Sequence, residues 1–186
     1  VPVGANHLLS RNSVVTSSTP EPDFGELAYI TDGKKDASTD DTANMVRLGN
    51  GLQWVQLDLG VTQKVYGVCI WRHHHLPQIY RDVVVQLSND RLFTNGVTTV
   101  FNNDHDNSSG LGTGTDKEYI ERNMGRCIPV NGIPARYVRV YSNGRYLERG
   151  IMDPSNYCTE IEVYGGTPTS QENTLLIIDI PRPQFL

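Results

Sequence analysis

The sequence has 186 residues, of which 38% are hydrophobic and 20% charged, and it carries a formal net charge of −5. This length and apolar content suffice for one buried core, whereas the acidic charge and scattered Lys and Arg residues exclude the basic surface of a nucleic-acid binder. No apolar run reaches the roughly 18 residues that cross a bilayer, and the first residues lack the pattern of a signal peptide, so we expect soluble material whose leader, if any, was removed upstream of Val1.

The chain consists largely of short runs with strand composition, separated by turns rich in Gly, Asn, Asp and Pro. In residues 54–60 the apolar Val55, Leu57 and Leu59 alternate with other side chains, as in a strand of an antiparallel sheet with one covered face. The predicted strands are residues 54–59, 64–71, 82–88, 97–101, 118–120, 136–141 and 160–164. This pattern predicts an all-β fold, a jelly-roll β-sandwich.

The strand pattern predicts one domain over residues 1–165, followed by a C-terminal segment, 166–186. Residues 165–170 have the composition of a linker, and residues 174–180 have that of a strand. This strand-like run either packs on the domain as an extra strand or begins a neighbouring module.

Loop lengths indicate where a site would lie. If successive strands run antiparallel, their connections alternate between the two ends of the sandwich. The longer connections, residues 31–52, 72–81, 102–117 and 142–159, then lie together at one end. Because function on a sandwich usually resides on clustered loops, we expect a binding site there.

Three cysteines cannot all pair within the chain. Cys69 lies in an apolar strand and is expected to be a buried core thiol. Cys127 and Cys158 lie beside predicted loops and form a bridge only if the fold brings their Cα atoms within about 7 Å. The sequence leaves that pairing open.

Five separated motifs add a family resemblance. They are residues 30–33 (ITDG), 54–60 (WVQLDLG), 83–90 (VVVQLSND), 135–144 (ARYVRVYSNG) and 160–165 (EIEVYG). In this order and spacing, from about Leu8 to Gly165, they resemble discoidin or coagulation-factor type C domains and the related carbohydrate-binding modules of the galactose-binding-like fold. Residues 101–107 resemble a bacterial branch of the family, many of whose members are modules of larger secreted polypeptides.

The resemblance implies a sugar site built from a loop histidine, an arginine, an asparagine and an aromatic platform. Polar groups would take the sugar hydroxyls while a ring covers the apolar sugar face, and Arg forks suit vicinal hydroxyls or a uronate. The candidate residues are Arg72, His73, His75, Arg81, Asn103, His105, Arg145 and Tyr146. Because the loop at 143–154 is longer than usual in the family, a galactose preference is not assumed.

Other interpretations of these residues stay open. The side chains of His73 and His75 point the same way in an extended chain and could chelate zinc or copper, but no third ligand has suitable spacing. The histidines could instead pack on Trp71 or Tyr80, and Tyr146 could lie back on the sandwich.

Residues 31–42 contain four aspartates that offer oxygen ligands to calcium, although they lack the EF-hand pattern and also suit a solvated acidic loop. The resemblance implies a structural Ca²⁺ bound by the loop of Asp32 and by Glu160, which opens the last strand. Lys35 and Ser38 would contribute backbone carbonyls.

Catalytic patterns are absent from the sequence: it contains no nucleophile elbow, phosphate loop or metal-hydrolase helix. Glu160 and Glu162 share one strand face, and we interpret them as a metal ligand and a solvated rim residue. The sequence therefore predicts a non-catalytic carbohydrate-binding module of a secreted or cell-surface, multimodular bacterial polysaccharide-processing protein, with a glycan as partner. A discoidin-type adhesion or protein-interaction domain is the alternative, and a hydrolase dependent on Glu162 or His105 is the minority hypothesis.

Overall fold

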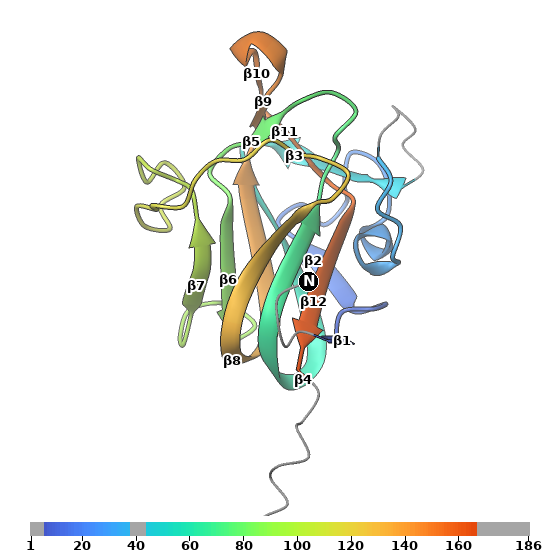
Figure 1. Cartoon of the computed structure of the whole chain (residues 1–186), viewed down its shortest axis with the longest axis vertical. Coiled ribbons are helices and arrows are strands. Elements are labelled where there is room, and N and C mark those ends of the chain that lie inside the picture. The colour runs from blue at the N-terminus through green and yellow to red at the C-terminus, as the bar shows by residue number, and fades with distance from the viewer. Residues whose placement is uncertain (1–5, 38–43, 167–186) are drawn as a thin grey trace, which may run out of the picture.

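The computed structural model describes residues 6–37 and 44–166, in which nearly all regular structure is β (Figure 1). The strands are β1 (His7–Leu8), β2 (Val14–Ser17), β3 (Val46–Asn50), β4 (Leu52–Trp71), β5 (Ile79–Tyr80), β6 (Val84–Ser88), β7 (Thr98–Asn102), β8 (Arg126–Asn143), β9 (Arg145–Tyr146), β10 (Met152–Asp153), β11 (Ser155–Cys158) and β12 (Glu160–Gly165). Two short 3₁₀ turns, η1 (Leu27–Thr31) and η3 (Glu148–Gly150), complete the labelled elements. Within the described residues, no helix has the length and apolar character that a membrane span requires.

Two long antiparallel strands, β4 and β8, form both layers of a sandwich. Residues 55–58 of β4 pair with β2, whereas residues 65–71 pair with β12. The register with β8 shifts between Asp58 and Gln63, where Gly60 takes a positive φ of 82°. Figure 1 shows both ribbons turning back at the bottom of the molecule, so each contributes one half to the front layer and one to the back layer. The predicted jelly-roll sandwich is confirmed.

The core fills the space between these layers. Val55 and Leu57 are buried, as their alternation predicts, and they pack with residues such as Val138 and Ile161 of the neighbouring strands. Burial of apolar side chains of this kind contributes roughly 1.5–3 kcal/mol each. The opposite face of β4 is partly covered as well, because Gln56 accepts a hydrogen bond from Arg139 at 2.8 Å.

One predicted strand is wrong, and several strands were missed, among them β2, β3 and β11. Residues 118–120 form no strand, while residues 126–133, for which no strand was predicted, form the first half of β8. Residues 126–133 replace 118–120 as a strand of the large sheet, so the parity of its connections is preserved. Smaller differences concern strand ends: β6 begins at Val84 because Asp82 has a φ of +50°, and β7 covers residues 98–102.

The disulfide prediction is also corrected. Cys69 of β4 lies directly opposite Cys127 of β8, with a Cα–Cα distance of 4.0 Å, and these two residues form a disulfide. Cys158 is a buried free thiol in the described part of the chain. A bridge between Cys127 and Cys158 is therefore excluded, and Cys69 is buried as expected but not free. The cross-strand register, which the sequence does not reveal, decides the pairing.

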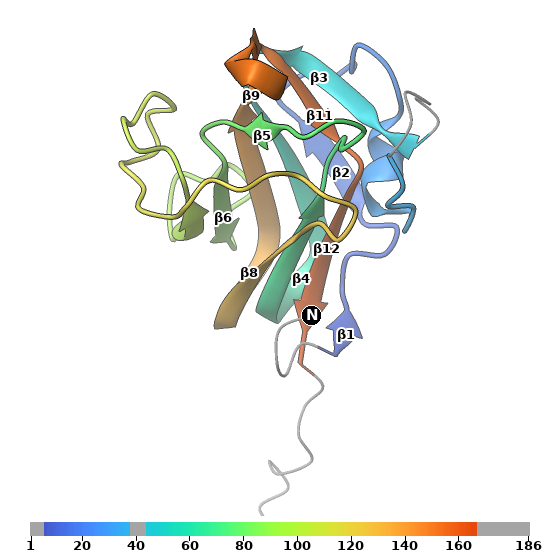
Figure 2. The same ribbon diagram turned by 45° about the horizontal axis from the view of Figure 1, so that its top comes forward.

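The long connections converge at one end of the sandwich, as the strand parity predicts. His74 donates its backbone N–H to the carbonyl of Ala37 at 3.3 Å, and Glu121 donates to Gln78 at 2.9 Å. β5, β9 and β10 form a small three-stranded sheet that joins the loops after β4 and β8. Figure 2 turns this end forward, with β5, β9, β3 and β11 side by side across it. The domain boundary at residue 165 stays a prediction, since residues 167–186 lie outside the described residues.

Candidate functional site

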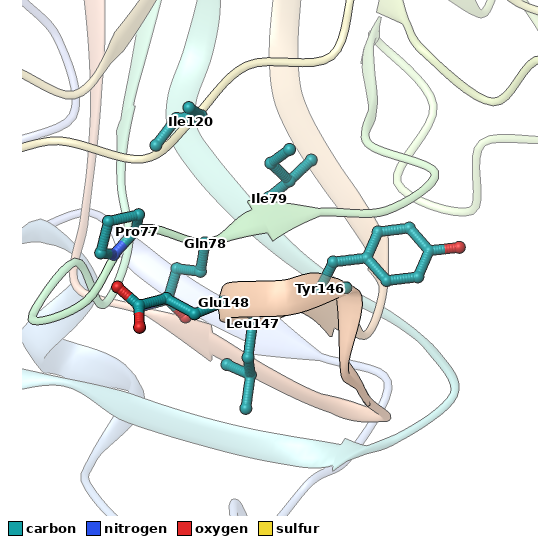
Figure 3. Close-up of a pocket in the computed structure, with 8 residues that line it drawn as sticks. Pro77, Gln78, Ile79, Ile120, Tyr146, Leu147 and Glu148 are labelled. Carbon is teal, nitrogen blue, oxygen red and sulfur yellow. The ribbon is translucent and has the colours of Figure 1, made fainter.

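A pocket of about 400 Å³ opens at the end where the loops converge (Figure 3). Its lining comes from the β4–β5 connection and β5, from the segment before β8, and from β9 and η3. The lining residues are Pro77, Gln78, Ile79, Ile120, Tyr146, Leu147, Glu148 and Gly150. In Figure 3 Pro77 lies at one end and the ring of Tyr146 at the other, with the Glu148 carboxylate near Pro77. The pocket is thus mainly apolar with a few polar groups, a composition typical of small-ligand sites.

A buried polar network centred on Arg145 lies beside this pocket. Arg145 is 7% exposed, and its guanidinium binds Asp153 through Nε at 2.9 Å and Nη2 at 2.7 Å. Its Nη1 donates to Nδ1 of His73 at 3.1 Å and to Oε1 of Gln78. Because Arg145 only donates, Nδ1 of His73 is the acceptor and the ring proton lies on Nε2. This network fixes the side chain of Gln78, which lines the pocket.

Tyr146 and Arg81 form a second contact pair at the pocket. The guanidinium of Arg81 lies 5.3 Å from the centre of the Tyr146 ring and 3.6 Å from a carboxylate oxygen of Asp82. A cation held against one edge or face of a ring restricts its orientation. Tyr146 is half-buried, so part of its ring faces solvent at the rim of the pocket.

Of the other predicted sugar ligands, His75 contacts the Arg145 network through His73, and Arg72 lies in the interior of the sandwich. The exposed ring of His75 stacks on His73 with centroids 6.3 Å apart. Arg72 is 3% exposed, donates to Ser142 Oγ at 3.0 Å and lies 4.6 Å from the Tyr80 ring. Arg72 therefore braces the loop ends from within the sandwich.

Asn103 and His105 lie apart from the pocket, in the loop after β7. Asn103 is buried, and its Oδ1 accepts the backbone N–H of Val83 at 2.6 Å. The exposed His105 contacts the carbonyl of Asp116 through Nε2 at 2.8 Å. Of the eight predicted sugar ligands, only Tyr146 lines the pocket. Arg81 contacts Tyr146, and Arg145, His73 and His75 contact one another behind the pocket, whereas Asn103 and His105 belong to neither group.

The same loop forms an acidic cluster with Asp82, which precedes β6. Oxygens of Asp82, Asp104 and Asp106 lie within 4.8 Å of one another. Asp82 accepts hydrogen bonds from Ser108 and Asn143, both at 2.9 Å, so the chain's own donors occupy part of the cluster.

Several pocket residues were not predicted from the sequence, because the predicted ligands were polar or aromatic residues. Pro77, Ile79, Ile120 and Leu147 are apolar residues within otherwise polar loops, and Ile120 is 47% exposed. A large apolar side chain in a polar loop is a weak signal by itself, but four such residues in converging loops would have indicated an apolar wall.

The predicted calcium residues surround the start of β12. The Glu160 carboxylate is 1% exposed and accepts the backbone N–H of Gly33 at 2.9 Å. Burial, together with the negative charges of Glu162 and Asp32, raises the pKa of Glu160 to about 7. A cation at this carboxylate would relieve the desolvation and the repulsion between carboxylates, so the donor set suits a hard metal ion. Ser38 lies outside the described residues.

Two lysines form ion pairs with the carboxylates of Asp32 and Glu162, near Glu160. Lys35 Nζ lies 2.8 Å from Glu162 and 4.4 Å from the centre of the Trp71 ring, and Lys34 Nζ lies 3.3 Å from Asp32. Lys35 can thus offer a metal only its backbone carbonyl. The interpretation of Glu162 as a solvated rim residue is wrong, since it is 2% exposed and accepts the Tyr164 hydroxyl at 2.5 Å.

Comparisons with known proteins support the fold. No family model matches the sequence, and no curated protein matches it significantly. Among solved structures, chitosan-binding module 1 from a chitosanase/glucanase of Paenibacillus sp. IK-5 matches with a TM-score of 0.57 and 24% identity, covering 86% of this chain and 100% of that one. The CBM32 of AlyQ in complex with 4,5-unsaturated mannuronic acid matches with a TM-score of 0.54 and 20% identity, over 81% and 92% of the two chains.

Other matches are parts of longer enzymes. A family 89 glycoside hydrolase from Clostridium perfringens matches with a TM-score of 0.60 and 14% identity, and this chain covers 88% of its own length but only 15% of that enzyme. These solved structures include carbohydrate-binding modules and lectin domains of the discoidin-like galactose-binding fold, which confirms the fold expected from the sequence resemblance.

Proposed function

We propose that this chain is a non-catalytic carbohydrate-binding module that binds sugar in the pocket beside Tyr146. The observation that carries the proposal is the pocket itself, an apolar hollow where the converging loops meet, flanked by Arg81 and backed by the Arg145 network. Its fold is that of known carbohydrate-binding modules. A preformed pocket favours binding because little ordering entropy remains to be lost.

Each part of the pocket has a role in sugar binding. The ring of Tyr146 and the side chain of Leu147 would cover the apolar C–H face of a pyranose. The exposed Glu148 carboxylate would accept hydrogen bonds from the sugar's hydroxyl groups. The amide of the buried Gln78 is engaged by Arg145, His73 and the Leu76 carbonyl, so Gln78 would support the pocket wall and not contact the hydroxyls.

The non-catalytic part of the proposal has its own support. A glycosidase needs two carboxyl groups facing the scissile bond in a cleft. Glu160 and Glu162 are both buried, and Glu162 is held by Lys35 and Tyr164. The solved structures that this chain covers over 92–100% of their length are binding modules and not catalytic domains.

A secreted, multimodular parent protein is also proposed. The disulfide between Cys69 and Cys127 suits an oxidising compartment. One neighbour is a truncated AlyQ with CBM32 and alginate lyase domains, of which this chain covers 34%. The parent would process polysaccharides, with this module holding it on the glycan.

A structural Ca²⁺ at the loop of Asp32 and at Glu160 completes the proposal. The buried Glu160 carboxylate, with its raised pKa, supports it, and Lys35 and Ser38 would add backbone carbonyls. When bound, the ion would supply positive charge that ties the loop to β12. It would act on stability and not on chemistry.

Glycan binding tests the function directly. Titration calorimetry and a glycan array would use galactosides, glucosamine and N-acetylglucosamine oligomers, uronates and fucosylated blood-group antigens, with Tyr146→Ala as the negative variant. We expect saturable binding to one class and its loss in Tyr146→Ala. If no glycan of the panel binds but a cell-surface protein does, the adhesion-domain alternative is favoured. Release of reducing ends from a glycan would favour a hydrolase.

A further inference from the structure

A second pocket adjoins the first. It has a volume of about 450 Å³ and is lined by His74, Pro77, Ile120, Glu121, Arg122 and Asn123. Pro77 and Ile120 belong to both pockets and form an apolar ridge between them. In Figure 3 Pro77 lies at the end of the first pocket away from Tyr146, so the second pocket continues the first beyond that end. Each volume lies near the lower limit for a small-ligand site.

Glu121 supports the wall of the second pocket from within. Its side chain is fully buried, with Nε of Arg72 3.9 Å from Oε1 and Tyr119 as its hydrogen-bonding neighbour. The carboxylate oxygens therefore face the interior of the sandwich and are not accessible from the pocket.

We propose that the two pockets are adjoining subsites of one groove, which binds an oligosaccharide of at least two sugar units across the ridge of Pro77 and Ile120. This inference rests on the proposed function and extends it from a single sugar to a chain. The first unit lies against Tyr146. The second lies between His74 and Asn123.

The exposed side chains of the second subsite supply its chemistry. Arg122 and Asn123 present N–H donors at the rim of the second pocket. Hydroxyl oxygens of the second sugar unit therefore accept hydrogen bonds from these two side chains.

A length series tests this inference. Calorimetry would compare one, two and three units of glucosamine, cello- and β-galacto-oligosaccharides on the same protein. For the series that binds, we expect at least a tenfold gain in affinity from one unit to two and little further gain at three. Equal affinity for one and two units would overturn the groove while leaving the proposed function intact. No binding in any series, nor to any uronate, would remove both.

Variants separate the subsites. Arg122→Ala combined with Asn123→Ala alters only exposed side chains of the second pocket and should weaken the disaccharide at least fivefold without changing the monosaccharide. Met124→Ala is the matched control, because Met124 is 77% exposed and lines neither pocket. Equal weakening of all lengths, or none, would contradict a second subsite.

Discussion

Arg145 donates a hydrogen bond of 3.1 Å to Nδ1 of His73 and so links the loop after β8 to the loop after β4. These residues are 72 positions apart in the sequence, and the same guanidinium pairs with Asp153. One buried side chain therefore organises two loops that line the candidate pocket.

Replacing Arg145 should cost both stability and binding. Arg145→Ala removes the ion pair with Asp153 and the hydrogen bond to His73, and we expect a loss of about 2–3 kcal/mol in the free energy of unfolding. Arg145→Lys keeps the charge but not the planar fork, so it should recover only part of this loss. Denaturant unfolding and glycan titration measure the two effects, and full rescue by lysine would contradict a role for the fork.

Tyr146 should matter for binding and little for folding. Its ring is half-buried at the rim, so Tyr146→Ala should leave the melting temperature nearly unchanged while weakening glycan binding at least tenfold, or about 1.4 kcal/mol. Tyr146→Phe keeps the ring and is the matched control, expected to bind almost as the natural chain does. If Tyr146→Ala binds normally, the sugar lies elsewhere.

Calcium should stabilise the fold through Glu160. With free Ca²⁺ at about 100 times its dissociation constant, linkage predicts a gain of roughly 2.7 kcal/mol, or several degrees in the melting temperature. Chelation should remove the gain. Glu160→Gln keeps an acceptor for the Gly33 N–H but should no longer respond to Ca²⁺, whereas the exposed control Glu118→Gln should respond fully. A melting temperature indifferent to both Ca²⁺ and chelator would refute the site.

Thiol counting tests the disulfide. With Cys69 bound to Cys127, the unfolded natural chain should show one free thiol and Cys158→Ser none, whereas a bridge from Cys127 to Cys158 would leave two free thiols in that variant. The bridge closes a loop between residues 58 positions apart. Removing it with paired alanines should cost about 4 kcal/mol in the loop-entropy picture.

The buried Glu121 should make stability depend on pH. Burial raises the pKa of Glu121 to about 7 from its usual 4.5, against the opposing charge of Arg72. The folded state then holds a proton that the unfolded state releases, so this contribution is fully present below pH 4.5 and is lost as pH rises through 7. The change in the free energy of unfolding across this window is about 3 kcal/mol.

Glu121→Gln should make this part of the profile less steep, while the contribution of Glu160, whose pKa is also raised to about 7, remains. Because the variant also leaves the charge of Arg72 without its partner, its absolute stability is expected to fall, and the slope between pH 5 and 8 is the informative quantity. Chemical denaturation at several pH values in that window measures it. An unchanged slope in the variant would place the titrating group elsewhere.

The alternation of side chains determined the main features of the fold. Val55 and Leu57 alternate with other residues and could be assigned to a covered face because strand side chains point to opposite faces in turn. Loop lengths and antiparallel parity placed four long connections at one end. These are local or counting arguments, and they need no knowledge of which strands pair.

Pairing and contact across the chain required the tertiary structure. Residues 126–133 include Pro129, which lacks an N–H and argues against a strand, yet they form half of β8 because they pair with β4 next to a shift in register. The same register places Cys69 opposite Cys127. Arg72 and Arg145 are both loop-end arginines in the sequence, but only the fold decides that the first lies over Tyr80 and the second holds the pocket, because long-range packing and not local composition sets where a flexible side chain ends.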